Sequence, residues 1–96
     1  MSKINITVKD DYEKPLQGAK VTLTSGDKSY TTGETGSAGG ASLTDVPYET
    51  YSVNITLPEG NDYELLDNYD DIVVDKENVD VNLIVHKVTP YVEDGG

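Results

Sequence analysis

Apolar and polar residues alternate with a period of two along several stretches of this chain, which is the pattern of strands with one buried face. The clearest stretches run from Tyr51 to Leu57, from Val79 to Val85 and from Ile4 to Val8, and another runs from Ala19 to Thr24. No window has the periodicity of a helix. Because successive side chains of a strand point to opposite faces, we expect every second residue of these stretches to enter a common core.

Shorter segments between these stretches predict further elements. Lys28–Thr32 is a polar segment suited to the edge of a sheet, and Ala41–Thr44 and Ile72–Val74 predict brief strands. The segment Tyr63–Tyr69 is open between a short strand and one helical turn. Gly33–Gly40 has four glycines among eight residues, a composition that predicts a mobile loop.

About seven strands at regular intervals, without helices, predict an all-β fold, an antiparallel Greek-key β-sandwich of about seven strands with an immunoglobulin-like or prealbumin-like architecture. We expect one domain over residues 1–88 and a flexible C-terminal tail over residues 89–96. A chain of 96 residues of which 35% are hydrophobic supports only one thin core. Cysteine is absent, so disulfides and thiol chemistry are excluded.

The formal net charge is −11, which disfavours nucleic acid and anionic membrane surfaces as partners. No apolar run approaches the roughly 20 residues that a membrane-spanning helix needs. The alternating pattern begins almost at Met1, so we expect no signal peptide. On this reading the chain is either made in the cytoplasm or taken from a longer exported protein.

Three motifs together carry a family resemblance. They are Pro15-Leu16-x-Gly18-Ala19-x-Val21-x-Leu23, the loop Thr31-Thr32-Gly33-Glu34-Thr35-Gly36, and Val46-Pro47-Tyr48-x-x-Tyr51-x-Val53. Over about Ile4 to Val88 the chain resembles the prealbumin-like (transthyretin-like) sandwich, and within it the B-type repeat domains of bacterial collagen adhesins and the carboxypeptidase regulatory-like domains. The resemblance implies a fold and says little about function.

Many collagen-adhesin B-type domains contain an internal isopeptide bond between a Lys of the first strand and an Asn or Asp of the last, assisted by an acidic residue. Matched along the motifs, the Lys position falls on Val8 and the acidic position on Ile55, while Lys9 faces the other way. Asn82 alternates away from the apolar face of the last strand. We therefore expect no isopeptide bond.

Acidic residues gather in the segment from residue 67 to residue 80. We interpret them as a solvated rim that discourages edge-to-edge aggregation. The alternative is a weak calcium site at Asp67, Asp70 and Asp71, although the EF-hand spacing is absent. No other cofactor is expected.

The sequence has no catalytic constellation. His86 is the only histidine, lies on the outward phase of the last strand and has no nucleophile in a recognisable motif, so we interpret it as a surface residue. All seven aromatic residues are tyrosines, which leaves a sugar-stacking surface as an alternative. They are Tyr12, Tyr30, Tyr48, Tyr51, Tyr63, Tyr69 and Tyr91.

These observations favour a non-enzymatic structural or binding module of a bacterial cell-surface protein, acting as a spacer, stalk or display domain. One alternative is a small structural protein of a bacteriophage virion, and another is a carbohydrate-binding accessory domain. The expected partners are other protein domains or surface glycans. We expect the isolated domain to be a monomer located outside the cell as part of a longer chain, or in a virion on the first alternative.

Overall fold

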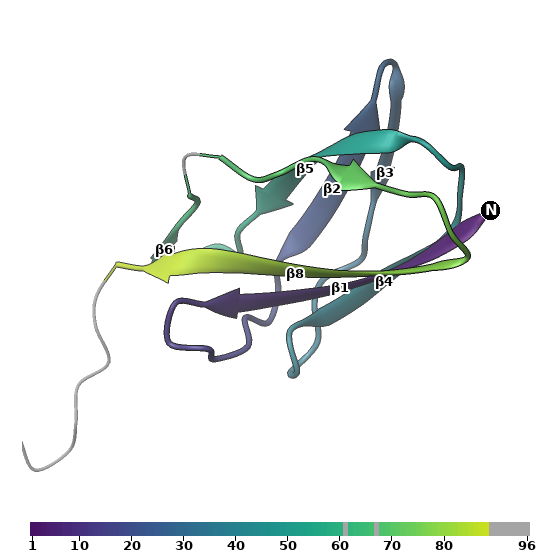
Figure 1. Ribbon diagram of the computed structural model, residues 1–96. Coiled ribbons are helices and arrows are strands. Elements are labelled where there is room, and N and C mark those ends of the chain that lie inside the picture. The colour runs from purple at the N-terminus through teal and green to yellow at the C-terminus, as the bar shows by residue number, and fades with distance from the viewer. Residues whose placement is uncertain (61, 67, 89–96) are drawn as a thin grey trace, which may run out of the picture.

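The chain folds into two facing four-stranded sheets, seen in the computed structural model of Figure 1. The structure describes residues 1–60, 62–66 and 68–88. The strands in these ranges are β1 (Ser2–Asp10), β2 (Lys20–Ser25), β3 (Lys28–Thr31), β4 (Gly40–Val46), β5 (Thr50–Thr56), β6 (Tyr63–Glu64), β7 (Ile72–Val73) and β8 (Asn78–Lys87). The predicted all-β sandwich is therefore confirmed. The described part contains eight strands rather than about seven, and the segment left open in the sequence forms the two-residue β6.

One sheet has the strand order β4-β1-β8-β6 and the other β3-β2-β5-β7. All named pairs are antiparallel except β1 and β8, which run parallel from Lys3↔Asn78 to Asp10↔Val85. The sequence predicted an antiparallel sandwich, and this one pair of strands departs from that prediction. The reason is that no hairpin joins these first and last strands, so no short turn imposes an antiparallel direction on them.

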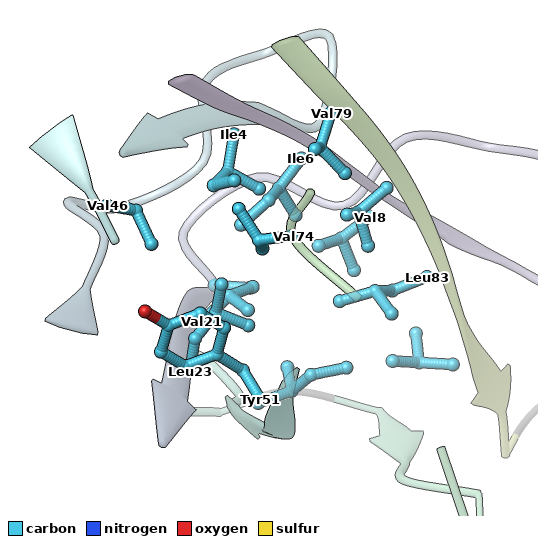
Figure 2. Packing of buried hydrophobic residues seen from close by; sticks show 14 of the residues in the cluster. Ile4, Ile6, Val8, Val21, Leu23, Val46, Tyr51, Val74, Val79 and Leu83 are labelled. Carbon is cyan, nitrogen blue, oxygen red and sulfur yellow. The ribbon is translucent and has the colours of Figure 1, made fainter. Parts of the chain in front are cut away.

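The core lies between the sheets and receives the inward residues of the alternating stretches, as predicted. Figure 2 shows Ile6 and Val8 of one sheet and Val21 and Leu23 of the other pointing into the same interior. Tyr51 is fully buried there, and its hydroxyl donates a hydrogen bond to the carbonyl of Pro47 at 2.7 Å. Burial raises the pKa of Tyr51, so the hydroxyl keeps the proton that it donates.

The inward phase of β1 ends on a polar residue, Asp10, which is 1% exposed. Its Oδ1 accepts hydrogen bonds from the backbone amides of Tyr12 at 2.8 Å and Lys14 at 3.0 Å. A carboxylate at this position therefore satisfies the amides of the turn that follows. The alternation predicted strand β1 but did not predict that its last inward position is polar.

The glycine-rich loop is held against the domain at two residues. Thr35 Oγ1 donates to the carbonyl of Leu16 at 2.6 Å and accepts from the amide of Ala19 at 3.0 Å. Gly39 has a φ of 77°, and its carbonyl accepts from the amide of Val8 at 2.8 Å. The loop that the composition predicts as mobile is thus fixed at two points, because Thr35 binds the segment before β2 and Gly39 binds β1. The same contacts explain why the Pro-Leu-x-Gly-Ala and Thr-Gly-rich motifs occur together in this sequence.

Candidate functional site

An open groove of about 510 Å³ is the main candidate site in the described part of the chain. One wall is the stretch of β8 from Val79 to Ile84, and the other is formed by Leu66 and the segment 68–73. That segment leaves β6, which pairs with the end of β8, and reaches β7, which pairs with β5 in the opposite sheet (Figure 1). The groove therefore lies between β8 and the segment that crosses from one sheet to the other.

Tyr69 joins the two walls of this groove. Its hydroxyl donates a hydrogen bond to the carbonyl of Ile84 at 2.7 Å and accepts one from the amide of Leu66 at 3.3 Å. Burial raises the pKa of Tyr69, so the phenol stays protonated and able to donate at neutral pH. The residue is thus positioned by strand β8 and in turn positions the segment that precedes β7.

The lining of the groove combines acidic and apolar side chains. Asp70, Asp71 and Asp80 contribute carboxylates, and all three are exposed. Leu66 and Val73 contribute apolar surface and are 43% and 59% exposed. No basic residue belongs to the lining that the structure describes. The arrangement is suited to a cationic, partly apolar ligand rather than to an anion.

The calcium hypothesis concerned Asp67, Asp70 and Asp71. Asp67 lies outside the described residues, whereas Asp70 and Asp71 are exposed and lie at the groove. Over residues 1–60, 62–66 and 68–88, no three acidic, histidine or cysteine side chains come close enough to hold a metal ion. Calcium binding at this segment stays a prediction, to be checked by titrating the protein with calcium and following the Asp70 and Asp71 amides by NMR.

His86 is an exposed residue with a partner that the sequence did not indicate. Its Nδ1 lies 2.8 Å from Oδ2 of Asp11, in the turn after β1, and Oδ1 of Asp11 accepts the backbone amide of Lys87 at 3.0 Å. These contacts lower the pKa of Asp11, mainly through the amide of Lys87 and secondly through His86. The cluster fastens the turn after β1 to the end of β8. A catalytic triad would place a hydroxyl or thiol at the other ring nitrogen, and no such hydrogen bond to His86 is found among the described residues.

Lys87 forms a second charged contact at the same end of the sheet. Its Nζ lies 2.9 Å from Oδ2 of Asp62 and 5.2 Å from the centre of the Tyr63 ring. The hydrogen bond to Asp62 raises the pKa of Lys87. These contacts hold β6 against β8 beside the groove, so the short strand depends on side chains as well as on its two backbone pairs.

Among the tyrosines that the structure describes, Tyr12, Tyr30, Tyr48 and Tyr51 do not form a common surface. Tyr51 is in the core, and Tyr30 packs edge-on against it with ring centres 5.9 Å apart. The exposed Tyr12 and Tyr48 lie beyond opposite ends of β1, because Asp10 precedes Tyr12 whereas Ser2 pairs with Val46. A nine-residue strand separates these ends by roughly 30 Å. Tyr91 lies outside the described residues.

The resemblance would place an isopeptide triad at three positions of this chain. Two of them hold buried apolar residues and the third faces outward, as the alternating pattern predicted. Val8 is fully buried and Ile55 is 5% exposed, both within the apolar core. Asn82 is exposed on the opposite phase of β8. An amine, a carboxamide and a carboxyl group are therefore not brought together at these positions.

In the described residues, no helix is long and apolar enough to span a membrane.

The family model "SpaA: Prealbumin-like fold domain" matches residues 2–88 of the chain. This match covers every strand of both sheets and the three motifs noted in the sequence. The comparison with curated proteins finds no match.

Three solved structures are similar to the chain over about nine-tenths of its length. The Bacillus anthracis TIE protein has a TM-score of 0.71 and 22% identity, covering 90% of this chain and 16% of that one. The group B streptococcus pilus 2b backbone protein has a TM-score of 0.71 and 22% identity, covering 92% and 42%. The streptococcal ancillary pilin has a TM-score of 0.67 and 18% identity, covering 90% and 32%. The chain thus spans less than half the length of each, and at this identity the likeness supports the fold alone.

Proposed function

Because the chain belongs to the SpaA prealbumin-like fold domain family, we propose that it is a non-catalytic structural module of a bacterial cell-surface protein. In this role it acts as a spacer or stalk unit that separates or displays neighbouring domains. The observation that carries the proposal is the family match over residues 2–88. One of the similar structures is described as a pilus backbone protein and another as an ancillary pilin, which supports the same setting for this chain.

The positions of the two ends of the domain support the spacer role. Strands β1 and β8 are parallel neighbours, so the chain enters at the Lys3↔Asn78 end of the sheet and leaves beyond the Asp10↔Val85 end. Figure 1 shows the N-terminus and the end of β8 on opposite sides of the molecule. Modules joined through such ends extend a chain by roughly 30 Å each, at about 3.3 Å per strand residue.

The cell-surface location can be tested with an antibody raised against the folded domain. Intact source cells would be labelled with immunogold before and after digestion of surface proteins with trypsin, and an antibody to a cytosolic enzyme would serve as the control. We expect the domain antibody to label the outside of the cell and the label to fall after digestion. Labelling confined to permeabilised cells would contradict the proposal, and labelling of purified bacteriophage particles would favour the virion alternative instead.

The carbohydrate-binding alternative depends on a shared aromatic surface. Since the exposed Tyr12 and Tyr48 lie at opposite ends of the sandwich, this geometry does not favour it. Glycan-array binding that was lost in Tyr12→Ala or Tyr48→Ala would favour carbohydrate recognition. Without such binding, the structural role remains the better proposal.

A further inference from the structure

The side of β8 that faces the groove has a backbone edge that is largely unpaired in the described part of the chain. On its other side β8 pairs with β1 along eight residues, but on the groove side it pairs only with β6, at His86 and Lys87. The carbonyl of Glu77 accepts from the amide of Lys3 in β1, so odd-numbered residues of this strand point their backbone groups toward β1. Even-numbered residues consequently point toward the groove, as Ile84 does when its carbonyl accepts from Tyr69.

Asp80 and Asn82 have the same phase as Ile84, so their amides and carbonyls face the groove. Among residues 1–60, 62–66 and 68–88, no hydrogen bond is found for these groups on that side. A free edge with this phase can accept a further strand at the usual spacing of about 4.8 Å. Such strand addition is a common way in which proteins bind extended peptides.

The side chains around this edge select the kind of strand that fits. Val73 on the opposite wall and Ile84 on β8 are exposed apolar residues that an added strand would cover. Asp70, Asp71 and Asp80 place three carboxylates at the same groove, and no basic side chain lines its described walls. A cationic strand is attracted, whereas a second copy of this chain, with a formal net charge of −11, is repelled.

We propose that this groove binds an extended, positively charged peptide segment of a partner protein, which adds as a strand to the free edge of β8. Alternate side chains of the segment cover Val73 and Ile84 while its basic side chains approach Asp71 and Asp80. The three carboxylates therefore both prevent pairing between identical edges and select a partner of opposite charge. Binding is a property of the domain itself and does not depend on its role as a spacer.

The test uses the folded chain and a short synthetic peptide in which Lys alternates with Val and Thr. A peptide with Glu in place of each Lys is the matched control. Hydrogen exchange followed by NMR reports the amides of Asp80 and Asn82 directly, because an added strand gives them hydrogen-bond acceptors and slows their exchange. We expect the Lys peptide to slow both amides at up to millimolar concentration, and the Glu peptide to have no effect.

Neutralising two lining carboxylates tests the charge selection. Asp71→Asn combined with Asp80→Asn should weaken binding of the Lys peptide by roughly three- to tenfold, and added salt should reduce the difference. The control is Asp27→Asn combined with Asp45→Asn, which removes the same charge from exposed positions outside the groove and should leave the affinity unchanged. If the control weakens binding equally, only the net charge matters and the proposed site is wrong.

An edge variant tests the backbone contact. Asn82→Pro removes an amide that faces the groove without removing a hydrogen bond to β1, and it should abolish binding. If this variant does not fold, the exchange of Asp80 and Asn82 in the unmodified chain still decides the question. The proposal is overturned by peptide-induced changes located only at other strands, by equal binding of both peptides, by no binding, or by concentration-dependent self-association that protects this edge.

Discussion

At the scale of single residues, the contacts of Thr35 and Gly39 hold the Thr-Gly-rich loop against the domain. Thr35 is 2% exposed and makes two side-chain hydrogen bonds, to the amide of Ala19 and the carbonyl of Leu16. Its backbone amide and carbonyl also bond to Ala19 and Gly18. Thr35 therefore connects the loop to the segment that enters β2 through both its main chain and its side chain.

Replacing Thr35 by Val keeps the shape of the side chain but removes both hydroxyl hydrogen bonds. The amide of Ala19 and the carbonyl of Leu16 lose these partners in a buried place, so we expect the free energy of unfolding to fall by about 2–4 kcal/mol. Thr44→Val, at an exposed position of β4, is the control and should change stability by less than about 0.5 kcal/mol. Urea denaturation measures both. Equal stability of the two variants would show that the Thr35 hydroxyl is unimportant.

Gly39 combines a positive φ with close contact to β1. A Cβ at this position would meet the carbonyl oxygen of Val8, a backbone atom that cannot move aside easily. We expect Gly39→Ala to lower the free energy of unfolding by about 2–4 kcal/mol. Gly26→Ala is the matched control, because Gly26 also has a positive φ but a methyl group there would have no other atom within 4 Å. The control should cost only about 1 kcal/mol, and a similar loss in both variants, measured by urea denaturation, would attribute the effect to φ alone.

At the scale of elements, the turn after β1 is attached to the last strand by Asp11. Because its pKa in the folded chain is lowered from the ordinary value of 3.8, Asp11 stabilises the fold above that value. This contribution is lost as the pH falls through the lowered pKa, since the protonated carboxyl no longer favours the contacts with His86 and the amide of Lys87.

We therefore expect Asp11→Asn to be less stable than the unmodified chain at pH 7, with the difference shrinking as the pH falls below the ordinary value of 3.8. Chemical denaturation at several pH values measures the difference. Asp27→Asn, in the exposed turn between β2 and β3, provides the comparison and should stay close to the unmodified chain throughout. A difference for Asp11→Asn that remained constant down to pH 2 would exclude ionisation of Asp11 as its cause.

The long strands could be predicted from the sequence because their pattern is local. Ile4 to Val8, Tyr51 to Leu57 and Val79 to Val85 each contain enough alternating residues to define a buried face, and the structure confirms those faces. The brief strand predicted at Ile72–Val74 is confirmed as β7, Ile72–Val73. The segment that forms β6 was left open between a strand and a helical turn, because two residues cannot display a period. The pairing of β6 with β8 and of β7 with β5 depends on neighbours distant in sequence.

The groove could not be predicted for a related reason. It requires that β8 be parallel to β1, that β6 end after two pairs, and that the following segment cross to β5, and none of these relations is visible in a local pattern. The acidic segment itself was evident, and the sequence predicted it as a solvated rim. The local pattern did not reveal the backbone of Asp80 and Asn82 that faces the groove beside it. Asp11 was missed similarly, since its partners lie 75 and 76 residues away.

At the scale of the whole molecule, we predict that no internal isopeptide bond links the strands of the sandwich. The positions of Val8, Ile55 and Asn82 do not bring an amine and a carboxamide together in the core. We expect the intact mass of the purified chain to equal the mass of its sequence. A deficit of one ammonia would reveal an isopeptide bond and contradict this expectation. Peptide mapping would then identify the two residues joined, and the chain denatured in guanidinium serves as a control against non-covalent adducts.

The parallel alignment of β1 with β8 has a mechanical consequence. When the two ends of the domain are pulled apart, the force runs along these adjacent strands and shears the eight registered pairs between them. The hydrogen bonds of a sheared pair share the applied force, whereas those of a hairpin opened from one end break in succession. The domain would thus resist stretching through one non-covalent ladder, and the opposite sheet would bear little of the force until that ladder slips.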